Sequence, residues 1–147
     1  MYAMTPKEIQ EWIKINIKDP IPMDDKSRLY EYLDVLSNTD SPIPYKEFAL
    51  KGLEMIASNY SAHSIILCGA LPLIRDQLNS PHPMLIAQSI RTLTSLANNG
   101  CEKEIIQEKL HTLVRNIVSI KSTPQYVKEQ GIKFYFKMLD TPLDHGF

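Results

Sequence analysis

The stretch from Asn59 to Asn99 holds three short apolar-periodic segments divided by helix-breaking residues. The first segment ends at Gly69, the second at the run Asn79-Ser80-Pro81-His82-Pro83, and the third at Asn98-Asn99-Gly100. Glycine and proline at such points stop a helix, so the stretch predicts three consecutive helices. Helical repeats recur at about 40 residues, which is the length of this stretch. The chain is therefore expected to be all-α and to consist of repeated helical units.

The segment before this stretch, Tyr45 to Asn59, repeats the pattern of the third predicted helix. A shift of about 40 positions brings residues onto others of the same kind, as expected of a repeat array. The coinciding pairs are Ala49 with Ser89, Leu53 with Leu93, Ile56 with Leu96, Ala57 with Ala97, and Asn59 with Asn99. The stretch is therefore interpreted as one member of an array.

The phrase Gly69-Ala70-Leu71-Pro72-Leu73-Ile74, followed at this spacing by Leu93-Thr94-Ser95-Leu96-Ala97, resembles the armadillo repeat family. The resemblance implies a right-handed armadillo-like α-solenoid of about three repeats, in which the third helix of each repeat lines a concave binding groove. We expect a single domain over residues 1–147, with a capping helix at 5–18, repeats at 24–59, 60–99 and 101–139, and a tail at 140–147. The first and third repeats leave open whether they are of armadillo type or of the related two-helix HEAT type.

Residues near the first predicted helix carry a clear start signal. Thr5 can cap the helix, Pro6 suits its first position, and Glu8 completes a capping box. In the first repeat, Phe48 is expected on the buried side, and in the third, Gly131 is expected where two helices approach closely. The further helices are expected at Asp24 to Asn38, Tyr45 to Asn59, Glu102 to Glu108, Leu110 to Val118, and Val127 to Leu139.

Composition restricts the classes of partner. Sixteen basic and seventeen acidic residues give a net charge of -1, which disfavours nucleic acid as the main partner. The apolar run from Ile65 to Ile74 is too short to cross a bilayer, and no basic segment followed by an apolar one marks a signal peptide. Cys68 and Cys101 do not make a disulfide scaffold and are expected as free thiols. These features predict a soluble, cytoplasmic protein without a membrane partner.

Signals for catalysis or for a cofactor are not found in the sequence. The four histidines lie in four different segments, and none has metal-ligand spacing to another ligand. No phosphate loop, nucleophile elbow or His-Glu-x-x-His helix occurs. Cys68 lies on an apolar face, and Cys101 has no base beside it in the sequence. We therefore expect neither an enzyme, nor a metal site, nor a cofactor.

Helix geometry indicates which residues line the groove that the resemblance implies. If Ser89, Ile90 and Leu93 face the core, a separate polar side of the same helix carries residues at i, i+3, i+7 and i+11. Those residues are Gln88, Arg91, Ser95 and Asn99. The same registration selects Lys51 and Met55 in the first repeat, and Gln130, Lys133 and Lys137 in the third.

Lys51, Arg91 and Lys133 could form a basic ladder along the groove, or they could be ordinary solvated side chains. A row of cations would attract an acidic, extended protein segment, with its main chain held by Gln88, Ser95 and Asn99. Armadillo import receptors carry a Trp followed four residues later by an Asn on this helix. Here the matching pairs are Lys51 with Met55, Arg91 with Ser95, and Lys133 with Lys137, which argues against a basic cargo.

The sequence thus predicts a non-catalytic protein-interaction module, an adaptor or scaffold, that binds an extended and acidic partner segment. The alternative is a structural or assembly element. In that case the chain is a piece of a longer solenoid, or it self-associates through its terminal helices, at Trp12 or at Tyr135 and Phe136. A nucleic-acid binder that uses the basic ladder is a third and more distant interpretation.

Overall fold

The computed structural model describes residues 5–9 and 23–139, and in this part of the chain the regular elements are all helices. The protein is therefore all-α over the described residues, as the sequence predicts. From residue 23 onward the helices are α2 (Met23–Ser37), α3 (Ile43–Asn59), α4 (Ala62–Leu67), α5 (Ala70–Leu78), α6 (Pro83–Asn98), α7 (Glu102–Gln107), α8 (Leu110–Ser119) and α9 (Gln125–Leu139).

The start signal at Thr5 is confirmed. The backbone N–H of Glu8 donates to Thr5 Oγ1 at 3.2 Å, and Thr5 Oγ1 donates to Glu8 Oε1 at 3.1 Å. Residues 6–9 form one helical turn, and the remainder of the predicted capping helix, like the predicted tail at 140–147, lies outside the described residues.

Helix ends follow the breakers in the sequence. Pro83 occupies the first turn of α6, where its missing N–H costs no hydrogen bond. Ser61 caps α4 by accepting a hydrogen bond from the N–H of Ser64 at 3.3 Å. Gly100 ends α6 with a φ of 93°, while the N–H of Cys101 donates to the carbonyl of Leu96 at 3.1 Å. This Schellman arrangement turns the chain sharply into α7.

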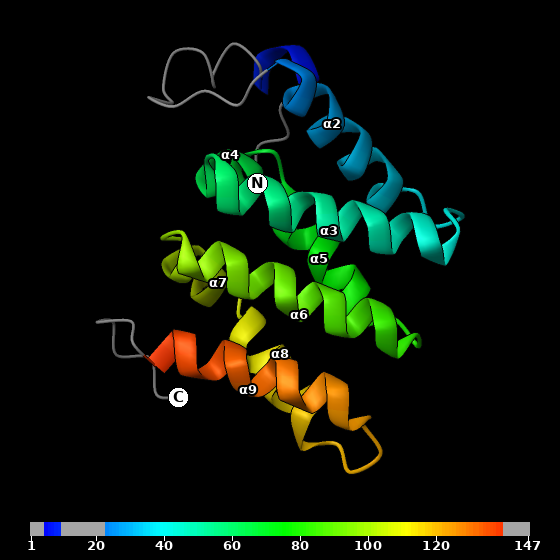
Figure 1. The fold of residues 1–147 in the computed structure, drawn as a ribbon, viewed down its shortest axis with the longest axis vertical. Coiled ribbons are helices and arrows are strands. Elements are labelled where there is room, and N and C mark those ends of the chain that lie inside the picture. Colours follow the sequence, from blue (N-terminus) through cyan, green and yellow to red (C-terminus); the bar gives the residue numbers. More distant parts are fainter. Residues whose placement is uncertain (1–4, 10–22, 140–147) are drawn as a thin grey trace.

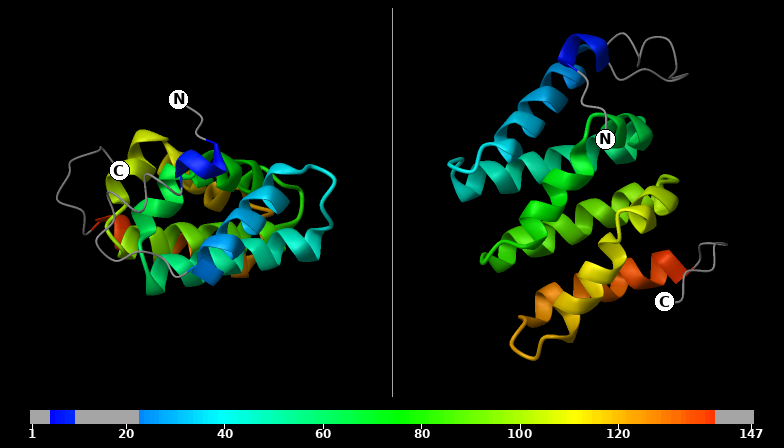
Figure 2. Two further views of the ribbon diagram at one scale, coloured as in Figure 1. Left: turned by 90° about the horizontal axis from the view of Figure 1, so that it is seen from above. Right: turned by 180° about the vertical axis from the view of Figure 1, so that it is seen from behind.

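The helices lie in successive rows (Figures 1 and 2). One row consists of α3, α6 and α9, which lie side by side, with α6 packed between the other two. A second row consists of α2, α5 and α8, which pack against α3, α6 and α9 respectively. The short helix α4 packs between α3 and α5, and the short helix α7 packs between α6 and α8. The middle helix of each row, α6 or α5, therefore contacts the helix on either side of it.

The core runs continuously between these rows. Its large side chains that are fully buried include Leu29, Leu50, Leu53, Ile56, Ile65, Ile74, Leu78, Leu85, Ile90 and Phe134. The expectation that Phe48 is buried is wrong, because its side chain is 66% exposed. The buried face of α3 centres on Ala49, Leu53 and Ile56, so Phe48 lies at its edge, where its ring packs edge-on against Tyr32.

Gly131 lies where α9 approaches α8, as the sequence predicts. A Cβ atom at this position would lie 2.2 Å from Cγ1 of Val118, which is too close for any real contact. A glycine here therefore lets α9 pack against the preceding helix. Across the described ranges, none of the helices combines the length and the apolarity needed to cross a bilayer.

Candidate functional site

A shallow groove crosses the row of α3, α6 and α9. It consists of two hollows, of about 390 Å³ and about 190 Å³, that share Arg91 and Gln130 in their walls. The larger hollow is lined by Glu54, Ser58, Arg91, Thr94, Ser95, Asn98, Asn99, Gln130 and Lys133. The smaller is lined by Glu47, Lys51, Met84, Ala87, Gln88, Arg91, Tyr126 and Gln130. We call the two together the α3–α6–α9 groove. A further hollow, of about 560 Å³, lies between the loops that precede α3 and α6 and contains none of the predicted site residues.

Most of the side chains predicted for the site come together in this groove. Its walls include Lys51, Gln88, Arg91, Ser95, Asn99 and Lys133. Met55 and Lys137 are not among the lining residues of either hollow. The prediction agrees with the structure here because the same spacing of groove-facing positions applies to α3, α6 and α9. Residues at matching positions on α3, α6 and α9 therefore face the same side of the molecule.

Gln88 and Ser95, which are predicted to hold a peptide main chain, line the groove but are largely buried. Gln88 is 4% exposed and Ser95 is 7% exposed, because α6 packs against α3 more broadly than an apolar stripe alone indicates. Gln88 Nε2 donates to Glu54 Oε1 at 2.9 Å, and Ser95 Oγ donates to the carbonyl oxygen of Glu54 at 3.2 Å. Ser95 Oγ also lies 2.8 Å from Ser58 Oγ. These two side chains bind α6 to α3 and form the floor of the groove.

The predicted basic ladder is partly neutralised by two glutamates of α3. Lys51 Nζ lies 3.2 Å from Glu47 Oε1, and an Arg91 guanidinium nitrogen lies 3.5 Å from Glu54 Oε2. Both cations are about half exposed, so each pair contributes little to stability, yet it sets the local charge. Lys133 has no ion-pair partner within residues 5–9 and 23–139. The unneutralised positive charge of the groove therefore lies on α9.

Two further amide side chains offer hydrogen bonds to a ligand, namely Gln130, which the helix registration predicts, and Asn98, which it does not. Asn98 and Gln130 line the groove, and neither amide is bonded to another described residue. Asn99 donates through Nδ2 to the carbonyl of Ser95 at 2.7 Å, which leaves its Oδ1 as an acceptor. An amide presents both donors and an acceptor, as the main chain of an extended peptide requires. The groove can therefore hold a peptide backbone by amide contacts.

The two ion pairs of the groove differ in whether the sequence could have predicted them. The spacing of Glu47 and Lys51 is that of a helical i,i+4 pair, so this neutralising contact could have been predicted. Glu54 and Arg91 are far apart along the chain and meet only because α3 packs against α6. No local pattern indicates that second pair.

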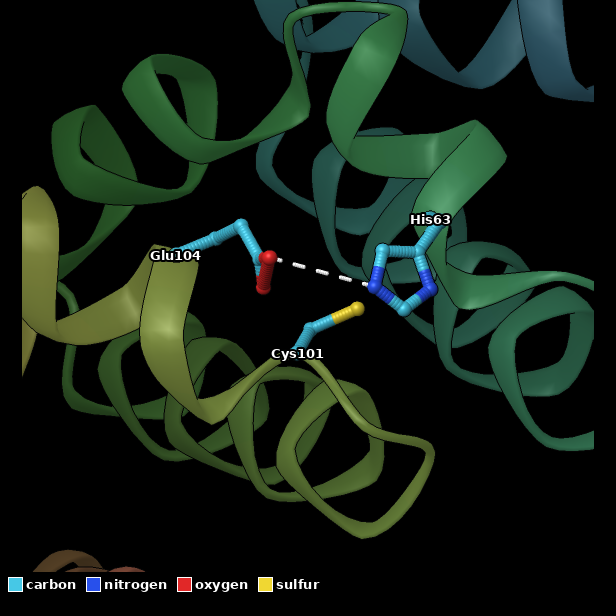
Figure 3. Close-up of side chains that lie close together, drawn as sticks. All are labelled: His63, Cys101 and Glu104. Carbon is cyan, nitrogen blue, oxygen red and sulfur yellow. Dashed lines mark ion pairs between the residues drawn. The ribbon is translucent and has the colours of Figure 1, made fainter. Parts of the chain in front are cut away.

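Neither cysteine is an activated nucleophile. Burial raises the pKa of Cys68 to about 12 and that of Cys101 to about 12, and the carboxylates of Glu104 and Glu102 add to the effect at Cys101. Both thiols are thus neutral at physiological pH, and a neutral thiol is a poor nucleophile. The expectation that no base lies beside Cys101 is wrong, because packing of α4 near the α6–α7 turn places His63 close to it (Figure 3).

Comparisons of the chain with protein-family models, with curated proteins and with solved structures found no match. The armadillo resemblance therefore stays a prediction, which depends on the quoted residues and on the arrangement of the helices.

Proposed function

We propose that the protein is a non-catalytic interaction module, an adaptor or scaffold, whose groove holds an extended segment of a partner protein. The observation that carries this proposal is the α3–α6–α9 groove, which is continuous across three helices at matching places in successive units. A site of this shape suits a strand-like ligand that lies across the helices. It is too open to enclose a small molecule, which binding pockets usually bury almost completely.

The fold that we propose for this module is a right-handed armadillo-like α-solenoid. Support comes from the units α4–α5–α6 and α7–α8–α9, each of which has a short helix, a medium helix and a long helix in that order. Further support comes from the two rows, in which α3, α6 and α9 contact one another in sequence and α2, α5 and α8 do the same. Free cysteines suit a reducing compartment, so we place the module in the cytoplasm.

The partner segment that fits the groove is acidic at the end that lies on α9. Lys133 is exposed there, and Lys137 follows one turn later. The charges of Lys51 and Arg91 are already balanced by Glu47 and Glu54, so the rest of the groove selects through hydrogen bonds and not through charge. A carboxylate that reaches Lys133 would form a charge-assisted hydrogen bond, which is stronger than a neutral one.

Selection from a displayed library of random linear peptides tests the proposal. We expect the parent chain to enrich peptides that carry Asp or Glu at one end. Lys133→Glu should remove or invert that preference, whereas Lys121→Glu, in the exposed loop between α8 and α9, should leave it unchanged. Failure to enrich any peptide would overturn the groove as a peptide site. Enrichment without a charge preference, or an equal effect of both reversals, would overturn the acidic partner alone.

The second candidate function is assembly through the outer face of α9, where a second copy of the chain would pack. The register that matches Val127 of α9 with Leu85 of α6 also matches Ile132 with Ile90 and Leu139 with Ala97. Ile90 and Ala97 are fully buried, with α9 packed against their helix, whereas Ile132 is 48% and Leu139 is 61% exposed. Phe136, on the same helix, is 67% exposed.

Light scattering after size exclusion separates the two candidates. A dimer of the parent that becomes a monomer in the Ile132→Lys, Phe136→Lys double variant favours assembly through this face. The matched control is Tyr45→Lys, because Tyr45 is 64% exposed at the start of α3, away from α9. A monomeric parent at all concentrations would contradict the assembly function and leave the peptide-binding module.

A further inference from the structure

The structure brings three side chains of metal-binding type together outside the groove. His63 of α4, Cys101 of the α6–α7 turn and Glu104 of α7 each offer one ligand atom, and these atoms all lie within 4.8 Å of one another. Figure 3 shows the imidazole, the thiol and the carboxylate converging on the same space between the two helices. Cys101 is fully buried, Glu104 is partly buried, and His63 closes the cluster toward solvent.

The contact between His63 and Glu104 is too long for a hydrogen bond. Nε2 of His63 lies 3.8 Å from Oε1 of Glu104, whereas a hydrogen bond between such atoms spans about 2.7–3.2 Å. In a tetrahedral zinc site, ligand atoms at the usual bond lengths of about 2.0–2.3 Å lie about 3.3–3.6 Å from one another. The observed separation is therefore close to a ligand–ligand edge. Side-chain rotations that move the atoms by about 1 Å would complete the geometry.

A buried oxygen atom without a hydrogen-bond partner indicates that the cluster can bind a ligand, and the direction of the thiol agrees with this. Oε2 of Glu104 is buried, and no described residue gives it a hydrogen bond. Such an oxygen is costly to leave unsatisfied unless a ligand reaches it. In addition, Cys101 occupies the N-cap of α7 but makes no capping hydrogen bond, whereas Ser61 at the matching position of α4 does cap its helix. The thiol instead points toward the imidazole of His63 (Figure 3).

We propose that His63, Cys101 and Glu104 form a three-ligand site for a divalent transition-metal ion of zinc type. Thiolate and imidazole ligands favour zinc over magnesium or calcium, which prefer sites made of oxygen alone. On binding, the metal displaces the thiol proton, which passes to solvent, and a water molecule fills the fourth position. The ion would bridge α4 to the start of α7, and would thereby link two consecutive units of the array.

Gly100 is a positioning residue for this site. Its left-handed φ of 93° reverses the chain after α6 and presents Cys101 toward α4. A Cβ atom at Gly100 would lie 3.7 Å from Cε1 of His63, so the imidazole ring packs over this turn. The same turn that joins two units therefore brings the two halves of the site together.

Cobalt(II) substitution of the full chain, after treatment with a chelator, tests the proposal. We expect one cobalt ion per chain, a visible spectrum of tetrahedral type and a thiolate-to-cobalt charge-transfer band in the near ultraviolet. Both signals should disappear in Cys101→Ser, in which the serine can cap α7, and should disappear or weaken at least tenfold in His63→Ala and Glu104→Gln. Cys68→Ser and His82→Ala are the matched controls, and should bind as the parent does.

Thermal unfolding gives a second and independent measurement. Zinc should raise the melting temperature of the parent and of the two controls by several degrees, because a ligand of the folded state stabilises it. It should not do so in His63→Ala, an exposed substitution that leaves the core intact. An absence of cobalt binding to the parent would overturn the proposal. It would also be overturned by binding that persists in Cys101→Ser or His63→Ala, or by loss of the band in Cys68→Ser.

Discussion

Lys109 has a left-handed backbone conformation, with a φ of 57°, at the position that corresponds to Gly69 in the preceding unit, where φ is 86°. Both residues directly precede the second helix of their unit. The turn between the first two helices therefore demands a positive φ, which glycine adopts freely and lysine does not. Arg75 of α5 holds the strained turn, because its guanidinium donates to the carbonyl of Glu108 and lies 3.6 Å from the carboxylate of that residue.

Replacing Lys109 with glycine should stabilise the protein. A side chain in the left-handed region costs about 1 kcal/mol or more, and Lys109→Gly removes that cost. We expect the free energy of unfolding in urea, followed by circular dichroism, to rise by about 1 kcal/mol. Lys133→Gly, in the right-handed helix α9, is the matched control and should lower it by about 1 kcal/mol. A Lys109→Gly variant that is no more stable than the parent would show that the backbone of Lys109 is not strained.

Ser64 has a hydroxyl that contributes nothing to the fold. Its residue is fully buried in α4, and its Oγ has no hydrogen-bond partner in the described part of the chain. Ser64→Ala removes the desolvation cost of this group, so we expect a gain of about 1 kcal/mol in the free energy of unfolding. The control is Ser89→Ala, since Ser89 is equally buried but donates to the carbonyl of Leu85 at 2.7 Å. Equal effects of the two substitutions would count against this explanation.

Periodicity and breakers predicted the helices well, because each helix end is determined locally. Gly69 and Pro83 lie at the boundaries where the sequence placed them, and Gly131 meets Val118 as the small residue that the helix approach requires. The groove was predicted less completely. Most of its lining residues could be predicted, because the same spacing of groove-facing positions applies to all three helices. Their burial, hydrogen bonds and ion pairs depend on packing between α3 and α6.

Contacts between units account for what the sequence did not reveal. Glu54 lies far from Gln88 and Arg91 in the chain, so no local pattern indicates that its carboxylate accepts a hydrogen bond from Gln88 and pairs with Arg91. The cluster of His63, Cys101 and Glu104 was missed for the same reason, since α4 and α7 belong to different units. A comparison of matching positions gives one indication of this cluster. Cys101 precedes α7 at the position where Ser61 precedes and caps α4.

Gly131→Ala should destabilise the protein through a clash with a single residue. The added Cβ would lie 2.2 Å from Cγ1 of Val118, and the β-branched valine cannot rotate away without cost. We expect a loss of about 1–3 kcal/mol in the free energy of unfolding, although alanine is the better helix former. Adding Val118→Ala should restore part of that loss, so a double-mutant cycle should give a favourable coupling of about 1 kcal/mol. Strict additivity of the two changes would show that Val118 is not the obstacle.

The stability of the protein should fall at alkaline pH in part through Cys68. Burial raises the pKa of this thiol from 9.0 to about 12 in the folded chain. Below pH 9 the thiol is protonated in both states, so its contribution is fully present. As the pH rises from 9 toward 12, the unfolded chain releases the proton while the folded chain retains it, and the contribution is lost.

A comparison with Cys68→Ala isolates this effect from the other groups that titrate at high pH. Between pH 8 and pH 10 the free energy of unfolding should fall by roughly 1 kcal/mol more in the parent than in the variant. Urea unfolding with reductant and chelator present measures both curves without oxidation of the thiols or metal binding. A stability difference between the two chains that does not change with pH would mean that the Cys68 thiol ionises equally in both states, and that its burial does not control its proton.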